Sequence, residues 1–276
     1  MISRLVTSLA LCILSTLVLC PVVKAEPVLV RFTEGVSRGF LTLRSANGEK
    51  LADGELLQML RPSGLESRLV FRFTDGSLHD ETVLYSQRRI FALLHYRLIQ
   101  RGASFPLALD VSFDRKRGRY EVRSQNGTGP EKTLSGQLSL PPDVYNGMTS
   151  TLLKNLRFGA SETVHLVAFT PEPRLVKVHL TPVGEEAVRV GDAYLMATRY
   201  QVKTDLKGFV GFLTSLLGME LPVLHYWIAR GEVPAFVKFE GPFFMDGPIW
   251  RVGSSYHTDG PDDPPRLALT PGLSPQ

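Results

Sequence analysis

Apolar and polar residues alternate along most of this chain, so that every second side chain is apolar. In 65–74, for example, Phe71 falls on one face of an extended chain and Arg72 on the other. The same alternation is found in 107–113 and 194–203. Because successive side chains of a strand point to opposite faces, these segments predict antiparallel strands with one buried and one solvated face.

Turn-forming residues separate the strand-like segments. Asn47-Gly48, Asp75-Gly76, Arg117-Gly118 and Arg230-Gly231 each lie between two of them, and glycine readily takes the positive φ that tight turns need. Roughly a dozen strands joined by such short connections predict an up-and-down meander rather than βαβ crossovers. Since a long sheet must curl to bury its apolar face, we expect an antiparallel meander curled into an incomplete or flattened β-barrel.

Two segments depart from the period of two and predict short helices. In 141–156, two prolines are followed by Val144, Met148 and Leu152 at every fourth position, as at the start of a helix. In 206–217, apolar residues follow helical spacing over about three turns. The expected fold is therefore mainly β with two short helices, which cover the opening that the curled sheet leaves.

The two ends of the chain differ from its middle in composition. Residues 1–25 combine a weakly basic start, an apolar run and small residues ending at Ala25, which predicts a cleaved signal peptide. Two alternatives stay open: a lipoprotein signal acylated at Cys20, and a leader retained as an anchor. The Pro-rich segment 254–276 predicts a disordered tail, which leaves 26–253 as a single β-rich domain.

The leader sets the expected compartment and excludes several classes of protein. We expect export to the periplasm and no transmembrane span in the mature chain, since the apolar run is shorter than the about 20 residues a spanning helix needs. Cys12 and Cys20 both lie in the leader, so disulfides and cysteine-bound metals are not expected. Without Arg4 and Lys24, 29 Lys and Arg face 27 Asp and Glu, and a net charge of about +2 gives no reason to expect nucleic-acid binding. No dinucleotide or phosphate-loop motif is present, so no cofactor is expected.

The stretch 72–81 holds the densest group of residues that could act in catalysis or bind a metal. On a strand, His79 and Glu81 share a face and Asp80 points away, so a metal would need further ligands from elsewhere. We therefore interpret the stretch as a solvated hairpin rather than a ligand or metal site. No nucleophile lies beside a base in a recognisable motif, so we expect no catalytic residues, and a hydrolase that uses His79 or His225 is a third hypothesis only.

The apolar segment 206–217 is the most informative functional feature. One interpretation is a helix that packs across the open end of the sheet and fills its core. Another is a mobile lid over an apolar cavity, which its glycine and phenylalanine residues favour. The predicted ligand contacts are apolar and aromatic residues of this segment and of the hairpin that follows it: Phe209, Phe212, Leu213, Leu216, Trp227 and Phe236.

From about 65 to 252, the chain resembles a known family. The most specific parts of the resemblance are Pro-Pro-Asp at 141–143 with Asn146-Gly147, then Trp227, Pro234, Glu-Gly-Pro at 240–242 and the segment 247–250. With these, the chain is similar to exported bacterial proteins of the domain of unknown function 3108 family. The resemblance implies an incomplete β-barrel of the kind seen in lipoprotein carriers, and it assigns no activity to particular residues.

Two functions are expected from these observations. The first is an exported, non-enzymatic protein that binds a lipid-like or other apolar molecule in a half-barrel pocket. The alternative is a cell-envelope interaction or assembly protein that docks onto a partner protein through 206–217. A cavity of several hundred Å³ would favour the first, and a solid core would favour the second.

Overall fold

The computed structural model describes residues 27–169, 172–205 and 223–255. These ranges contain 14 strands and one α-helix. The first eight strands are β1 (Ser37–Ser45), β2 (Lys50–Arg61), β3 (Gly64–Phe73), β4 (Leu78–Gln87), β5 (Phe91–Arg101), β6 (Leu107–Asp114), β7 (Arg119–Asn126) and β8 (Lys132–Gln137). After the helix α1 (Thr149–Asn155) come β9 (Glu162–Phe169), β10 (Pro173–Val190), β11 (Ala193–Asp205), β12 (Leu224–Ala229), β13 (Ala235–Gly241) and β14 (Trp250–Ser254).

All the described strands belong to one antiparallel sheet. Its order is β8-β7-β6-β5-β4-β3-β2-β1-β14-β13-β12-β11-β10-β9. Each half of the sheet is a meander of hairpins, and the pairing of β1 with β14 joins the two halves. Because β8 and β9 are separate edges, the sheet is open. The predictions of a mainly β fold and of an antiparallel meander that does not close are thereby confirmed.

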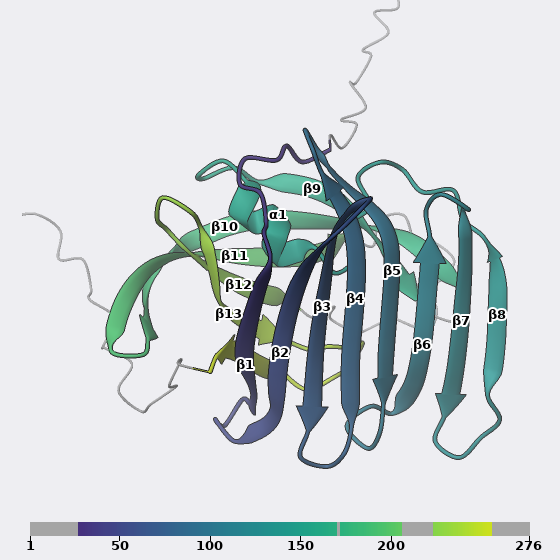
Figure 1. Ribbon diagram of the computed structural model, residues 1–276. Helices are drawn as coiled ribbons and strands as arrows, with labels where there is room; N and C mark the ends of the chain where they lie inside the picture. The colour runs from purple at the N-terminus through teal and green to yellow at the C-terminus, as the bar shows by residue number, and fades with distance from the viewer. Residues whose placement is uncertain (1–26, 170–171, 206–222, 256–276) are drawn as a thin grey trace, which may run out of the picture.

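The sheet folds back on itself around α1 (Figure 1). Strands β1–β8 stand side by side as one layer, and β9–β13 run across behind them, with α1 between the two layers. Inward-facing side chains of both layers therefore meet one another and the helix.

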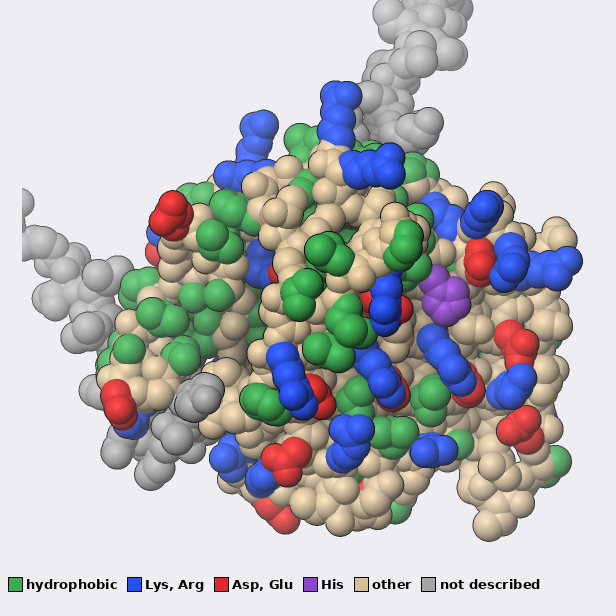
Figure 2. Space-filling view, viewed as in Figure 1, with side chains coloured by type: hydrophobic (Ala, Val, Ile, Leu, Met, Phe, Trp, Pro, Cys, Tyr) green, Lys and Arg blue, Asp and Glu red, His purple; other side chains and the backbone are tan. Residues whose placement is uncertain are grey.

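The outward-facing positions of β3–β6 carry charged residues, as the alternation predicts. Arg68 pairs with Asp80 on the neighbouring strand (2.5 Å), and Arg97 pairs with Asp110 (2.8 Å). Figure 2 shows basic and acidic side chains interspersed over this face. Since exposed pairs contribute only about 0–1 kcal/mol each, the stability of the sheet must come from its inner face.

The helix α1 is shorter than the helix predicted over 141–156. It begins only after Gly147, whose φ of 70° no regular helix contains. Before it, Val144 forms a parallel bridge with His165 of β9 instead of a helical turn. The two prolines thus lead into turns at 142–143 and 146–147 with a single bridge residue between them, which corrects the prediction. The second predicted helix, over 206–217, lies outside the described residues.

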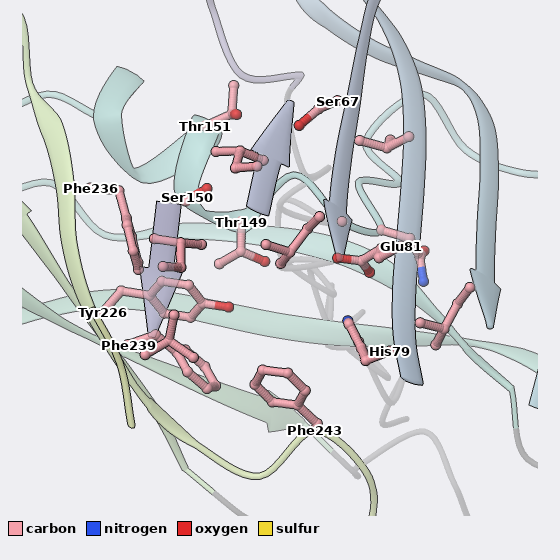
Figure 3. A pocket seen from close by; sticks show the side chains of 18 of the residues that line it. Ser67, His79, Glu81, Thr149, Ser150, Thr151, Tyr226, Phe236, Phe239 and Phe243 are labelled. Carbon is pink, nitrogen blue, oxygen red and sulfur yellow. The ribbon is translucent and has the colours of Figure 1, made fainter. Parts of the chain in front are cut away.

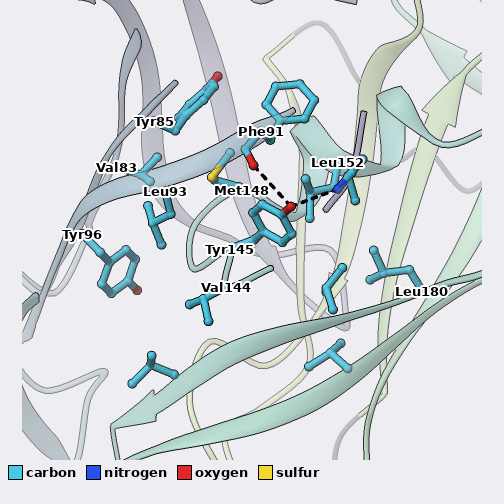
Figure 4. Packing of buried hydrophobic residues seen from close by; sticks show 14 of the residues in the cluster. Val83, Tyr85, Phe91, Leu93, Tyr96, Val144, Tyr145, Met148, Leu152 and Leu180 are labelled. Atoms are coloured by element: carbon cyan, nitrogen blue, oxygen red, sulfur yellow. Dashed lines mark hydrogen bonds between the residues drawn. The ribbon is translucent and has the colours of Figure 1, made fainter. Parts of the chain in front are cut away.

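The helix and the residues just before it fill one side of the space between the layers (Figure 4). Tyr145, Met148 and Leu152 are at most 1% exposed. The Tyr145 hydroxyl donates to the carbonyl oxygen of Phe91 (3.3 Å) and accepts the N–H of Val28 (3.0 Å). We call this apolar cluster the packed core; its fully buried members also include Leu65, Tyr85, Leu93, Val111, Val144 and Leu153.

Polar side chains hold α1 against the start of the described chain. The side-chain oxygen of Asn155 accepts the N–H groups of Arg31 (2.8 Å) and Phe32 (2.7 Å). Lys154 forms an ion pair with Glu34. Because all three contacts reach the last turn of the helix, they fix its position relative to the layers.

Candidate functional site

A cavity of about 380 Å³ lies beside α1, between the inner faces of the two halves of the sheet (Figure 3). Its walls come from β1–β5, from β9, from β12–β14 and from residues 146–154 around α1. Its volume lies within the roughly 300–1,000 Å³ range of small-molecule sites. The apolar part of the wall consists of Leu41, Leu56, Leu69, Phe71, Val83, Leu98, Leu166, Leu224, Phe236, Phe239, Pro242, Phe243 and Val252.

The hairpin of β3 and β4 forms part of this wall. Its turn is as predicted, with Gly76 at a φ of 83°. The interpretation of the following residues as solvated is wrong, because His79 is 6% exposed and lines the cavity together with Glu81. Asp80 points outward to Arg68, so the predicted alternation itself is correct. Strand parity alone does not say which of the two faces is buried.

His79 lies at an aromatic end of the cavity. Its ring centroid is 4.8 Å from that of Phe243, and Phe71 and Phe105 lie further out. The side-chain nitrogen of Gln100 is 3.1 Å from His79 Nδ1 and 3.2 Å from the carbonyl oxygen of Phe243, and it donates to both. Burial lowers the pKa of His79 to about 4. The imidazole is therefore neutral at neutral pH, with its proton on Nε2.

Glu81 and Tyr96 form a polar side of the cavity. The Tyr96 hydroxyl donates to Glu81 Oε1 (2.8 Å). Burial raises the pKa of Glu81, and this hydrogen bond partly offsets the effect. Burial and the neighbouring carboxylate raise the pKa of Tyr96 well above its ordinary value. A Cβ on Gly147 would come within 3.2 Å of Glu81 Cδ, so the absence of a side chain there leaves room for the pair.

Further hydroxyl groups line the same cavity as Glu81. Protein atoms surround Glu81, yet it borders the cavity and so is only partly buried. The Tyr226 hydroxyl points into the cavity from β12 (Figure 3). Burial, and next the charge of Glu81, raise the pKa of Tyr226. Thr149, Ser150 and Thr151 of α1 also line this space, which makes the site amphipathic rather than purely apolar.

The structure separates the predicted ligand contacts. Phe236 lines the cavity. Trp227 lies on the other face of β12, where its ring N–H donates to Glu186 (2.9 Å) and the ammonium of Lys238 lies 4.9 Å from its ring centroid. Outside the described residues are Phe209, Phe212, Leu213 and Leu216.

The sequence reasoning missed the polar side of the site. Tyr96 and Tyr226 were not singled out, and His79 and Glu81 were assigned to a solvated hairpin. The hairpin itself indicates where these two side chains point. In the pairing of β3 with β4, His79 lies opposite Phe71 and Glu81 lies opposite Leu69, and both partners belong to the apolar face of β3. Side chains opposite each other on paired strands share a face, so both should face the interior.

The described ranges contain neither a cluster of metal ligands nor a membrane-spanning helix. Among those residues, no group of three or more His, Cys, Asp or Glu is placed to hold a metal ion. The one α-helix in the same ranges lacks the length and apolar character needed to cross a membrane.

Comparison with known proteins adds little to this picture. No family model and no curated protein matches the chain. Among solved structures, it is similar to a beta-barrel-like protein of domain of unknown function DUF1849 from Brucella abortus. The TM-score is 0.42, with 11% sequence identity, over 79% of this chain and 94% of that chain. A likeness this low says nothing about function, and the relationship to the domain of unknown function 3108 family stays a resemblance.

Proposed function

We propose that this chain is an exported, non-enzymatic protein that binds a lipid-like or other apolar small molecule in the cavity beside α1. The observation that carries the proposal is the cavity itself, about 380 Å³ with a mostly apolar wall and a few converging polar groups. That combination is typical of ligand sites. A fully packed interior would have favoured the assembly role instead.

The size of the cavity limits the ligand. At roughly 30 Å³ per non-hydrogen atom, the share of a water molecule in the liquid, a volume of about 380 Å³ holds on the order of a dozen such atoms. This fits one medium-length chain or a small ring compound, and it is too small for a whole two-chain phospholipid. Each buried methylene contributes about 0.8 kcal/mol, so a chain of that length can be held by its apolar part.

The proposed compartment rests on the N-terminal segment. Residues 1–25 have the composition of a cleaved signal peptide. An exported carrier that shields an apolar molecule from water would suit the periplasm. Docking onto an envelope protein through 206–217 is the alternative, and it depends on residues outside the described ranges.

Bound molecules in the purified protein test the proposal. The mature chain is purified after export and analysed by native mass spectrometry and solvent extraction. We expect a co-purifying apolar molecule, or binding of added decan-1-ol measured by calorimetry. A protein that carries no molecule from several hosts and binds no added probe would contradict the proposal.

Two adjacent substitutions on β3 provide a matched pair. Leu69→Trp places a large ring in the cavity and should abolish binding, whereas Arg68→Trp places the same ring on the outer face and should leave binding intact. Circular dichroism confirms that both variants are folded. Equal binding by the two variants would show that the probe binds elsewhere.

A further inference from the structure

Glu81 is the unmatched charge of the cavity. Its Oε1 accepts the hydroxyl of Tyr96, and among the described residues no Lys, Arg or His forms an ion pair with it. Lys154, the other charged residue of the lining, is paired with Glu34. A carboxylate that protein atoms largely shield from water is costly without a counter-charge, even when it is only partly buried. A cationic group on a ligand would supply that charge.

The aromatic wall of the same cavity also favours a cation. The ring of Phe239 lies 4.9 Å from that of Tyr226 and 5.7 Å from that of Phe243, so the three rings form a continuous surface. His79 continues this surface, 4.8 Å from Phe243, and adds no positive charge because it is neutral. Aromatic faces attract ammonium groups, most strongly where water is excluded.

We infer that the cavity selects a protonated amine carried on a single apolar chain, with its ammonium group against Glu81. This inference rests on the proposed function and names its class of ligand. An ammonium group has three N–H donors; Glu81 accepts one, and the hydroxyls of Tyr226 and Thr149 border the same space. The apolar wall, to which Leu69 and Leu98 belong, accommodates the chain.

The same geometry disfavours other head groups. A fatty acid would bring a second carboxylate towards Glu81, and two like charges in a site of low polarity repel. An alcohol could donate one hydrogen bond to Glu81 but would leave its charge unbalanced. The expected order of affinity is therefore amine, then alcohol, then carboxylate.

Three probes with the same ten-carbon chain test this order. The mature protein is titrated by calorimetry with decylamine, decan-1-ol and decanoate below their micelle concentrations. Decylamine should bind wild type at least about tenfold more tightly than decan-1-ol, the effect of one charge-assisted hydrogen bond, and decanoate should bind most weakly. Glu81→Gln should lose about tenfold or more in affinity for decylamine and keep its decan-1-ol affinity within about threefold, since the amide oxygen still accepts from Tyr96.

Glu66→Gln is the matched control. It removes the same charge from the outer face of β3, where Glu66 pairs with Arg61 (2.7 Å), and it should leave all three affinities unchanged. Selectivity for amines is overturned if decan-1-ol or decanoate binds wild type as tightly as decylamine, or if Glu81→Gln has no more effect than Glu66→Gln. The ranking on wild type stands even if a variant fails to fold. Failure of all three probes to bind overturns the proposed function as well.

Discussion

The two sides of α1 meet different surroundings. Leu152 and Leu153 point into the packed core and are each 1% exposed. Thr149 and Ser150, in the first turn of the same helix, line the cavity. A helix whose purpose was only to fill the sheet would carry apolar residues on both sides. The hydroxyl-bearing side therefore indicates that the cavity is a surface in its own right rather than a packing defect.

Strand β4 passes from one surrounding to the other within a few residues. His79 and Glu81 line the cavity, and Tyr85, on the same face, is fully buried in the packed core. The different lengths of α1 and β4 explain why one end of the strand is packed and the other borders the cavity. A seven-residue helix such as α1 is about 10 Å long at 1.5 Å per residue, whereas a ten-residue strand such as β4 spans about 33 Å. The helix fills the sheet only where it reaches, and the remainder stays hollow.

The largest expected effect is the loss of the packed side of α1. Leu152→Ala removes a fully buried side chain and should lower the free energy of unfolding by about 2–5 kcal/mol. Ser150→Ala, two residues earlier on the cavity side, should change it by less than about 0.5 kcal/mol. Urea unfolding of both variants provides the measurement. Similar losses in the two variants would mean that the two sides of α1 are packed alike.

The next largest effect is a dependence on pH that distinguishes His79. Its folded pKa of about 4 lies below its ordinary value of 6.5, so acid protonates the unfolded chain first. The stability that His79 contributes is present above pH 6.5 and is lost as the pH falls towards 4. At 1.36 kcal/mol per pKa unit, the loss approaches about 3 kcal/mol. The measurement is the free energy of unfolding of wild type and of His79→Gln at several pH values. The difference between the two proteins should shrink as the pH falls, and a difference that does not change with pH would show that the ring is not shielded from water.

A smaller effect is expected when the cavity side of α1 is made apolar. Ser150→Leu places a branched side chain into the cavity and should raise the free energy of unfolding by about 1 kcal/mol, as cavity-filling substitutions commonly do. It should also weaken binding of decan-1-ol, because it occupies the same space. Lys154→Leu is unsuitable as a control because it breaks the pair with Glu34. Thr82→Leu adds an apolar group on the outward face of β4, which Thr82 shares with Asp80, and it breaks no ion pair. A similar gain in stability there would rule out cavity filling as the cause.

The strands were predictable because alternation and turns act locally. The segment 65–74 corresponds to β3, and 107–113 corresponds to β6. The positive φ of Gly48 and of Gly118 agrees with the predicted turns. Each of these strands and turns depends on neighbouring residues alone, so a single sequence is enough to predict it.

An apolar pocket was expected from the sequence, but its polar side could not be predicted in the same way. Its polar side joins Glu81 of β4, Tyr96 of β5, Gly147 before α1 and Tyr226 of β12, and no local pattern brings those segments together. The helix was predicted too long because prolines and four-residue spacing suggested a start at 141, whereas Gly147 takes a φ of 70°. A helix of the predicted length would have filled more of the space inside the sheet.

The smallest expected effect distinguishes the polar side from the aromatic end, because Glu81 and His79 respond to pH with opposite signs. Burial raises the folded pKa of Glu81 above its ordinary value of 4.5, so the folded protein retains the proton to higher pH than the unfolded chain does. The stability of wild type relative to Glu81→Gln should therefore be greatest below pH 4.5 and should decline as the pH rises through the folded pKa. The hydrogen bond from Tyr96 limits the decline. Decylamine should reverse it, because a cation that binds the ionised carboxylate stabilises the folded protein at the pH where the free protein is weakened. The measurement is the free energy of unfolding of wild type and of Glu81→Gln over this pH range, with and without decylamine. If decylamine does not change the loss of wild-type stability at higher pH, the amine does not bind beside Glu81.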